Sequence, residues 1–516
     1  MTQEEIAALI VECRTEEAER EIEALIENRP EDPATWVLKA TLEESKGNLD
    51  AEREAIAKGM ALDPRHYELF YMLGILYAYH NFNQAYLCME QAYFYCDHEE
   101  DRVMIADAME ALKTKPGFSV RPFSVVILSY NDKELMSHCV EAFRRDCAPS
   151  SYEMVVVDNH SDDGVAEWLR EQTDLRLIES GENVGFPIGC NIGFRAAAPG
   201  NDLLMINNDA VPAPNAVFWL RMGLYENVNI GATGAVSNKA SMQFVLGAPD
   251  TLEECMAFGA KRNVPRRKTY EDRCRLTGFA FLLKREAAEA IRMDKDLFDT
   301  RFSPGYFEDD DLGMRIAAAG YRQVVCHNAF IYHRGGSGFA GNDDAMTRSR
   351  QLFLDKWGFD IWAYEGVWYE MIELIEEERE ENEPVRVLEF FCGMGMELSR
   401  IRYLFPYAYV AGVEPNAMIA GFGRYMGDIV CGDGETLDYP WAEHSFDYVI
   451  VSDAVKNARD PEAMVAKIVR YLKPDGAILY EQGKDKAHAV HMERMLDKEG
   501  FTKREHAGDL VRARRQ

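Results

Sequence analysis

The sequence is short of positive charge. It carries 57 Lys and Arg residues against 88 Asp and Glu residues, which gives a formal net charge of -31 at pH 7. Binding along a phosphate backbone needs clustered Lys and Arg side chains. We therefore expect no nucleic-acid partner, and interpret the charge as that of an ordinary protein surface in water.

Long apolar runs and paired cysteines are missing as well. No stretch reaches the roughly 18 apolar residues of a membrane span, and the opening residues Met1 to Glu5 have neither a basic flank nor an apolar core. The eleven cysteines include no C-x-x-C pair, which argues against a zinc ribbon or a disulfide framework. We expect a cytoplasmic protein with no secretory signal and no membrane span.

A chain of 516 residues is too long for one hydrophobic core, so several domains are expected. The pattern along the chain predicts a helical domain over residues 1–115, an α/β domain over 120–360, an acidic helical linker over 361–384 and a second α/β domain over 385–516. The acidic run from Glu373 to Glu383 is interpreted as a solvated helix and linker.

The first region has a helical pattern throughout, with apolar residues at intervals of three and four from Glu4 to Lys113. The segment Asp32 to Trp36 is echoed by Asp63 to Tyr67, a shift close to the length of helix-pair repeats. This region resembles a tetratricopeptide-type array, and a plain helical bundle is the alternative. Either one predicts a binding or assembly module that recruits an acceptor or a protein partner.

The middle region begins where Lys115 to Gly117 breaks the helical pattern. The apolar run Phe123 to Ser129 is typical of a buried strand, and runs at 154–157, 175–178 and 203–206 alternate with helical stretches. This alternation predicts a parallel sheet. Ligands of such sheets bind at the carboxyl ends of the strands.

Polar side chains stand at those ends. Ser129 to Asn131 follow the first strand, Asp158 to Gly164 the second, Asn183 to Gly193 the third, and Asn207 to Asp209 the fourth. Asx-rich loops after strands also form turns, so a purely structural role is the alternative. The glycines between 183 and 193 permit close approach of backbone to a ligand, and Asp209 stands where a hard cation can bind.

The order of these pieces resembles family 2 glycosyltransferases of the GT-A fold, within them the rhamnosyltransferase-like branch, over about residues 123–357. The resemblance implies a nucleoside-diphosphate sugar as donor and Mg²⁺ or Mn²⁺ as the metal. It assigns Asp158 to the nucleobase or ribose and Asp209 to the metal. The implied donor-binding residues are Ser129, Asn131, Asp158, Asn183, Gly185, Asn191, Asn207, Asn208 and Arg334.

Two later motifs extend the resemblance. Leu276 to Leu283 is similar to the acceptor-side strand of the family, and Glu308 to Asp311 is similar to the acidic block that contains its general base. By position we expect Asp309 to be the base, with Glu308 and Asp311 orienting acceptor hydroxyls or supporting the loop. The alternative is a helix N-terminus carrying acids that the helix dipole stabilises.

The segment Ile331 to Gly338 resembles the closing motif of the family. There His333 completes the metal shell, and Arg334 can pair with phosphate oxygens. The implied reaction is a single in-line displacement at the anomeric carbon, with inversion of its configuration. The metal stabilises the departing diphosphate, and Asp309 takes the acceptor proton.

The C-terminal region resembles class I S-adenosylmethionine-dependent methyltransferases, with a Gly-rich turn after its first strand and an acid after its second. The implied cofactor-binding residues are Glu389, Cys392, Gly393, Gly395, Glu414 and Asp433. Phe391 replaces the usual first glycine and crowds the turn, and Lys456 to Arg459 lacks the common His. An active methyltransferase and a relic or assembly domain are both open.

The whole pattern predicts a modular glycosyltransferase whose acceptor is a surface polysaccharide or a surface protein such as flagellin, with methylation of the product as a further step. One alternative is a methyltransferase with an inactive sugar-transferase domain. The other is a non-enzymatic scaffold built on the helical repeats.

Overall fold

The computed structural model describes residues 1–335, 343–451, 455, 458–482 and 486–516. The chain divides into two compact units, one of residues 1–270 and 275–358, the other of residues 271–274 and 359–516. An all-helical region and a GT-A-type α/β domain make up the first unit, and a class I methyltransferase-like Rossmann domain makes up the second. This is the fold class that the sequence predicts.

The helical region contains α1 (Gln3–Val11), α2 (Thr15–Asn28), α3 (Pro33–Ser45), α4 (Leu49–Leu62), α5 (Tyr67–Ala78), α6 (Phe82–Tyr95) and α7 (Glu99–Lys113). The echo in the sequence marks the starts of α3 and α5. Asp32 caps α3 by accepting a hydrogen bond from the Ala34 N–H at 3.1 Å, and Asp63 accepts one from the Arg65 N–H at 3.0 Å just before α5.

One carboxyl group of this region is buried without compensation. Glu52 of α4 is only 1% exposed, and no described residue forms a hydrogen bond with either of its carboxylate oxygens. Burial, aided by the negative charge of Glu44, raises the pKa of Glu52 to about 7. The helical region therefore contains a carboxyl group that favours its protonated form.

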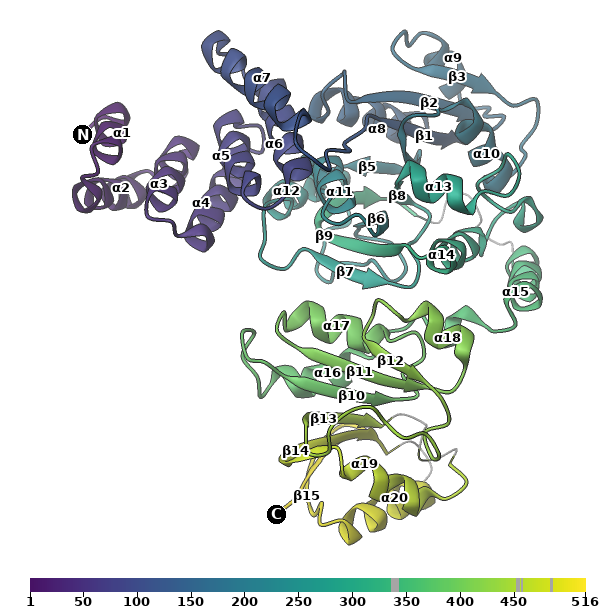
Figure 1. The fold of residues 1–516 in the computed structure, drawn as a ribbon. Coiled ribbons are helices and arrows are strands. Elements are labelled where there is room, and N and C mark those ends of the chain that lie inside the picture. Colours follow the sequence, from purple (N-terminus) through teal and green to yellow (C-terminus); the bar gives the residue numbers. More distant parts are fainter. Residues whose placement is uncertain (336–342, 452–454, 456–457, 483–485) are drawn as a thin grey trace. The chain divides into compact units, whose positions relative to one another are not determined.

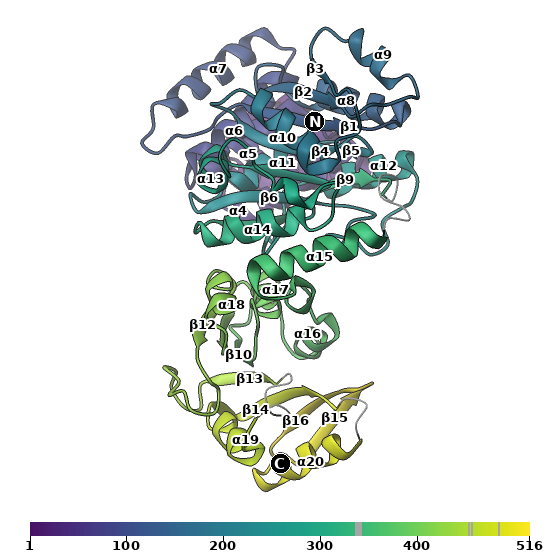
Figure 2. The same ribbon diagram turned by 90° about the vertical axis from the view of Figure 1, so that its right-hand side faces the viewer.

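The last helices of this region pack against the α/β domain, where α6 lies beside α11 (Figures 1 and 2). Glu90 of α6 and Arg221 of α11 form a buried ion pair. The Gln84 side chain donates a hydrogen bond to the backbone oxygen of Met222 at 2.8 Å. Because a buried charge that loses its partner costs several kcal/mol, these contacts fix α6 to the α/β domain.

The sheet of the first unit has the order β3-β2-β1-β4-β8-β6-β9-β5. Its strands are β1 (Phe123–Ser129), β2 (Tyr152–Asp158), β3 (Arg176–Glu179), β4 (Asp202–Asn207), β5 (Ala210–Pro212), β6 (Ile230–Val236), β8 (Ala280–Leu283) and β9 (Arg322–His333). β1 to β4 are parallel to one another, and β8 runs antiparallel to β4. β7 (Tyr270–Arg273) runs from the residues of the first unit into those of the second.

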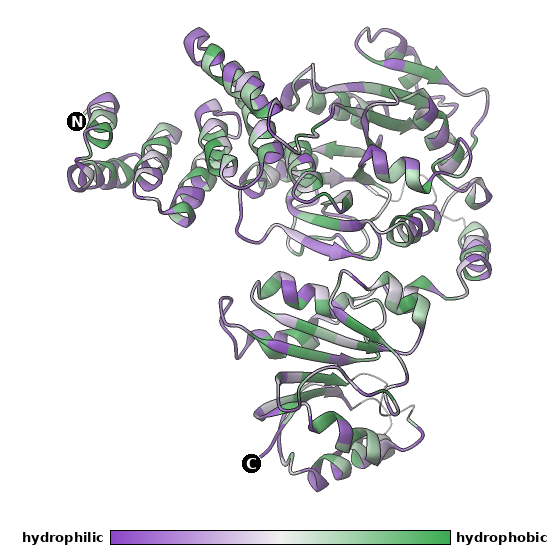
Figure 3. Cartoon of the chain, viewed as in Figure 1, coloured by the Kyte–Doolittle hydropathy of each residue, from purple (hydrophilic) through white to green (hydrophobic). Residues whose placement is uncertain are grey.

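The helices of this domain are α8 (Lys133–Asp146), α9 (Val165–Arg170), α10 (Phe186–Ala196), α11 (Ala216–Leu224), α12 (Leu252–Arg262), α13 (Arg285–Ile291), α14 (Glu308–Ala318) and α15 (Asp343–Trp357), with a 3₁₀ turn at Thr300–Phe302. The central strands are almost wholly apolar and buried, and they are mostly green in Figure 3. Such strands are typical of a parallel sheet covered on both faces.

The sheet of the second unit has the order β12-β11-β10-β13-β14-β16-β15, parallel except for β16, which is antiparallel to both of its neighbours. Its strands are β10 (Arg386–Phe390), β11 (Tyr409–Glu414), β12 (Asp428–Cys431), β13 (Phe446–Val451), β14 (Leu472–Glu481), β15 (Lys503–Ala507) and β16 (Leu510–Arg514). Its helices are α16 (Tyr369–Glu376), α17 (Met396–Leu404), α18 (Ala417–Phe422), α19 (Pro461–Val469) and α20 (Lys486–Lys498), with a 3₁₀ turn at Ile361–Ala363.

The segment predicted to be an acidic helical linker contains a helix with one buried face. Helix α16 buries Met371, Ile372, Leu374 and Ile375, and these side chains join the core of the second unit. Glu370, Glu373 and Glu376 lie on the exposed face of this helix, and the rest of the acidic run follows its end. The high content of Glu obscured the apolar pattern of α16 in the sequence. This helix has one apolar face and belongs to the domain that follows it.

Candidate active site

The register of the sheet brings the predicted donor-binding loops to one edge. Ser129 of β1 is paired with Asp158 of β2, and Leu128 is paired with Asn207 of β4. The side chains of Ser129 and Asp158 are buried, and the Ser129 Oγ and Asp158 Oδ1 atoms have no hydrogen-bond partner among the residues that the structure describes. Buried polar atoms nearly always have one. Two neighbouring polar atoms at a strand end are thus left for a ligand to satisfy.

Other predicted donor residues are tied to one another. The turn after β1 has two consecutive residues in the left-handed region, Asn131 at φ 58° and Asp132 at φ 64°. The Asn208 side chain donates a hydrogen bond to the backbone oxygen of Asn131 at 2.6 Å, and Asn131 Oδ1 accepts one from the Asp162 N–H at 2.9 Å. Arg334 pairs with Asp132 at 2.5 Å. The loops after β1, β2, β4 and β9 therefore meet at this edge.

Asn191 does not face that edge. Its side chain is fully buried in α10, its Oδ1 accepts from the N–H groups of Leu297 and Phe298, and its Nδ2 donates to the Phe298 oxygen. All of these bonds hold the 297–298 backbone in place. The contact of Asn191 with the donor stays a prediction, and in this structure its amide is bonded inside the fold.

The glycines near Asn183 also serve packing. A Cβ atom on Gly185 would lie 2.7 Å from Pro304 Cα, and one on Gly193 would lie 2.3 Å from Val126 Cγ1. These glycines let chain segments and the helix α10 approach each other closely, which explains them without a ligand. A contact of Gly185 with the donor stays a prediction. Asn183 is exposed, and its Oδ1 accepts from the Asn159 side chain and the Gly185 N–H.

Asp209 and His333, the predicted metal ligands, lie together. The pairing of β5 with β9 sets Ala210 opposite His333, and the His333 Nε2 is 3.4 Å from the Asp209 Oδ1. The His333 Nδ1 is 2.7 Å from the backbone oxygen of Lys239. A proton on Nδ1 satisfies that contact and leaves the lone pair of Nε2 directed towards Asp209. Two lone-pair donors facing each other can share a divalent cation.

The acidic block forms the first turn of α14, and its members differ in their surroundings. Asp309 Oδ2 accepts a hydrogen bond from the Gly278 N–H at 2.8 Å and is 3.5 Å from Arg275. Asp311 is buried and bonded to Arg315, Lys356 and Trp357.

Glu308 is also buried, and within the described part of the chain its Oε2 has no hydrogen-bond partner. Burial and the charge of Asp309 raise the pKa of Glu308 well above its usual range, so Glu308 favours the protonated form. Among the three predicted acids, Asp309 is less buried than Glu308 and Asp311, and its carboxylate accepts hydrogen bonds from the N–H groups of Gly278 and Asp310.

A short chain of contacts joins the metal pair to Asp309. The Phe279 ring stacks on the His333 ring with centroids 4.9 Å apart. The backbone oxygen of Phe279 accepts a hydrogen bond from the Asn207 N–H at 2.9 Å, and the adjacent Gly278 binds Asp309. Asp209 and Asp309 are thus grouped around the ends of β4 and β8.

In the second unit, the turn after β10 departs from a standard cofactor loop. Phe391, in place of the usual first glycine, takes a left-handed φ of 58°, a conformation that bulky residues rarely adopt. Glu414 at the end of β11 accepts hydrogen bonds from the N–H groups of Gly393 at 3.2 Å and Asn416 at 2.8 Å. A Cβ atom on Gly393 would lie 3.0 Å from Cδ1 of Tyr364.

The remaining predicted cofactor residues are also engaged. Glu389 is buried beside Glu397, and burial together with the Glu397 charge raises its pKa well above the usual range. Cys392 packs against Gly412, and Asp433 pairs with Arg459. The Tyr364 ring lies against Gly393, so these residues do not fit S-adenosylmethionine bound against that glycine.

The comparison with known families decides what the middle domain is. The model of glycosyl transferase family 2 matches residues 124–290. This part of the chain is a family 2 glycosyltransferase domain. The protein is accordingly a nucleotide-sugar-dependent glycosyltransferase. A methyltransferase domain model matches residues 388–480, so the enzyme also carries a methyltransferase domain by fold.

Solved structures of both kinds are similar to parts of the chain. The mannosyltransferase PcManGT from Pyrobaculum calidifontis, in complex with GDP-Man and Mn²⁺, is 18% identical with a TM-score of 0.34, over 53% of this chain and 74% of that one. GalNAc-T7 with UDP, GalNAc and Mn²⁺ is 16% identical with a TM-score of 0.34, over 43% of this chain and 46% of that one. A methyltransferase from Aquifex aeolicus is 12% identical with a TM-score of 0.23, over 27% and 87%. Values this low decide neither the substrate nor the metal.

No curated protein matches the sequence. Among the helices in the described part of the chain, none is both long and apolar enough to cross a membrane. Two segments of the predicted motifs, Gly336 to Gly338 and Lys456 to Asn457, lie outside the described residues.

The glycosyltransferase site includes residues that the sequence did not single out. Arg275 reaches both Asp309 and Asp310, and Asp132 pairs with Arg334. Each stands within a few positions of a motif, Arg275 before Gly278 and Asp132 after Asn131. Their charge next to a motif is the signal that would have found them.

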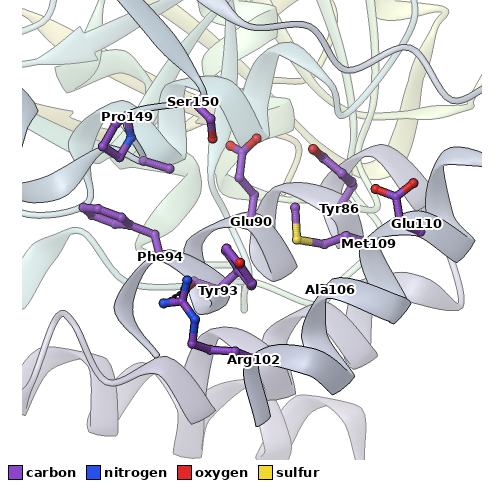
Figure 4. Close-up of a pocket in the computed structure, with 11 residues that line it drawn as sticks. Tyr86, Glu90, Tyr93, Phe94, Arg102, Ala106, Met109, Glu110, Pro149 and Ser150 are labelled. Atoms are coloured by element: carbon purple, nitrogen blue, oxygen red, sulfur yellow. Dashed lines mark hydrogen bonds between the residues drawn. The ribbon is translucent and has the colours of Figure 1, made fainter. Parts of the chain in front are cut away.

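A cavity of about 510 Å³ lies elsewhere, between α6, α7 and the turn at Ala148 to Ser150 (Figure 4). Its walls carry the aromatic side chains Tyr86, Tyr93 and Phe94 and the charged side chains Glu90, Arg102 and Glu110. The Arg102 guanidinium lies 4.3 Å from the centre of the Tyr93 ring. None of the predicted active-site residues lines it, so this cavity is separate from the transfer chemistry.

Proposed function

We propose that the protein transfers a glycosyl unit from a nucleoside-diphosphate sugar to an acceptor hydroxyl in one metal-assisted, inverting displacement. The observation that carries this proposal is the grouping of Asp209, His333 and Asp309 around the ends of β4 and β8. The alternative function, a non-enzymatic scaffold built on the helical repeats, does not account for this grouping.

The donor would bind along the carboxyl edge of the parallel strands. The Ser129 and Asp158 side chains offer their unpartnered oxygens to the nucleobase or ribose. Arg334, already near Asp132, is the positive charge placed to meet phosphate oxygens. Asn131 and Asn208 hold these loops together, and we assign them to shaping the pocket.

Asp209 and His333 would hold Mg²⁺ or Mn²⁺. A carboxylate oxygen and an imidazole nitrogen 3.4 Å apart provide two ligands, and oxygens of the donor diphosphate would fill other coordination positions. The backbone oxygen of Lys239 fixes the His333 ring in the required tautomer. Such a cation would neutralise the negative charge that develops on the departing diphosphate.

Asp309 would act as the general base. The acceptor oxygen forms a bond to the anomeric carbon while the bond from that carbon to the β-phosphate oxygen breaks, and the electron pair leaves with the nucleoside diphosphate. The acceptor proton passes to the Asp309 carboxylate. The Gly278 N–H and Arg275 hold that carboxylate in place. Attack opposite the leaving group inverts the anomeric carbon.

The helical region would recruit the acceptor or a partner protein in the cytoplasm. It contains 25 acidic and 11 basic residues over positions 1–115, which favours a partner with positive charge. The aromatic walls of its cavity provide the apolar contact area that binding sites require. A surface protein such as flagellin, or a surface polysaccharide, is the acceptor class that we propose. Methylation is left out of the proposal, because Tyr364 fills the cofactor turn.

A screen of nucleoside-diphosphate sugars tests the proposal. We expect at least one of them to raise the melting temperature of the full-length protein, more strongly with Mn²⁺ than with EDTA, and to release nucleoside diphosphate slowly by hydrolysis. The matched control is Glu254→Gln, which changes a first-turn acid of α12 that is bonded to Thr251. If no sugar nucleotide shifts the melting temperature in either condition, the proposed donor site is wrong.

A further inference from the structure

The segment before α16 crosses the cofactor turn of the second unit. Tyr364 contacts the open face of Gly393, where a Cβ atom would lie 3.0 Å from its ring. A glycine at this place of a nucleotide-binding turn lets a ligand approach the backbone. Here the space beside Gly393 is occupied by Tyr364 of the same chain.

The tyrosine is held in that place from both sides. Its ring meets Phe359 edge to face at 5.7 Å, and Phe359 in turn packs against Phe422 of α18 at 6.0 Å. Farther along, the Trp368 N–H donates a hydrogen bond to Glu397 of α17 at 3.1 Å. The stretch from 359 to 368 is thus anchored at each end, and Tyr364 lies between the anchors.

Tyr364 also lies near enough to Glu414, the acid expected to bind a ribose, to be affected by its charge. Burial, with a contribution from the Glu414 charge, raises the pKa of Tyr364. Glu414 is the carboxylate that accepts the Gly393 N–H. The ring therefore covers the glycine whose N–H is bonded to Glu414, and both residues are ones that the resemblance assigns to the cofactor.

We propose that the Tyr364 ring takes the space of S-adenosylmethionine at the Gly393 turn, so that the second unit excludes this cofactor while the ring is in place. Phe391 tightens the same turn, because its bulky side chain stands in a left-handed position normally given to glycine. This inference is independent of the proposed sugar transfer, since it concerns residues of the second unit alone.

Calorimetric titration of the full-length protein with S-adenosylmethionine and with S-adenosylhomocysteine tests the inference. We expect no measurable binding by the wild type or by Tyr364→Phe, which keeps the ring. We expect Tyr364→Ala to bind at least about ten-fold more tightly, because a site open in less than a tenth of the molecules loses that factor in affinity. Tyr407→Ala, which removes an exposed tyrosine of the same unit, is the control and should behave as the wild type.

Two further variants make the test decisive. Tyr364→Val removes the ring but keeps an apolar side chain. It replaces Tyr364→Ala in the test if circular dichroism shows that Tyr364→Ala does not fold. Tyr364→Val combined with Phe391→Gly should bind more tightly than the single variant. Wild-type binding as tight as that of the variants would overturn the inference. So would folded variants, including the double one, that bind neither ligand, because the ring would then not be what excludes the cofactor.

Discussion

Replacement of Asp309 by Asn is the sharpest test of the transfer mechanism. Asn keeps an oxygen that can accept the Gly278 N–H at the 2.8 Å position now held by Asp309 Oδ2, but it cannot take a proton. Removing a general base typically lowers the rate 10²- to 10⁴-fold, which corresponds to about 2.7–5.5 kcal/mol in the activation free energy. We therefore expect kcat to fall by that factor while the donor dissociation constant changes less than about two-fold.

The fold should tolerate this change. Arg275 keeps its contact with Asp310 at 2.8 Å, so the variant loses one charge-assisted contact, worth about 1–2 kcal/mol of unfolding free energy. The assay measures release of nucleoside diphosphate with and without acceptor, beside donor binding by calorimetry. Unchanged turnover in Asp309→Asn would remove it as the base. A parallel loss of donor affinity would instead place it in the donor site.

Three further outcomes follow from particular contacts. His333→Ala should weaken nucleotide binding about ten-fold or more in Mn²⁺ and leave binding in EDTA unchanged; equal Mn²⁺ dependence in calorimetry would contradict the metal role. Gly193→Ala should destabilise the first unit by about 1–3 kcal/mol in urea titrations, because the new methyl group would lie 2.3 Å from Val126 Cγ1; a stability equal to that of the wild type would show that α10 can shift freely. Burial raises the pKa of Glu52 from 4.5 to about 7 in the folded state. Between these two pH values the folded state binds more protons at Glu52 than the unfolded state does. The free energy of unfolding therefore falls as the pH rises from 4.5 to about 7. After allowance for partial solvation, Glu52→Gln should remove about 1–3 kcal/mol of that fall between pH 5 and 8, and an unchanged pH profile would refute the burial argument.

Much of the fold could be predicted from the sequence, because burial patterns are local. The strand at Phe123 to Ser129 shows seven apolar or small residues in a row and was placed with its observed bounds. The helical region up to Lys113 followed from its apolar spacing. The order of polar groups after β1, β2 and β4 indicated the edge where the site would form, since parallel strands end at one edge of a sheet.

The purpose of individual residues was harder to predict. Asn191 and Gly185 stand in the expected loop, yet one bonds to the backbone at 297–298 and the other makes room for Pro304. The identity of a polar or small residue does not show whether it contacts a ligand or a neighbouring segment of the chain. Only the tertiary structure shows which of the two surrounds it.

By itself the sequence determined the fold class, the three-part order of the chain and the family of its middle domain, because these depend on periodicity and on motifs that are contiguous in the chain. The tertiary structure alone decided which side chains meet. Asp209 faces His333 across more than a hundred residues, and Tyr364 covers Gly393 from a segment that the sequence marks only as a linker. Such contacts depend on the packing of distant segments, for which a single sequence carries no local signal.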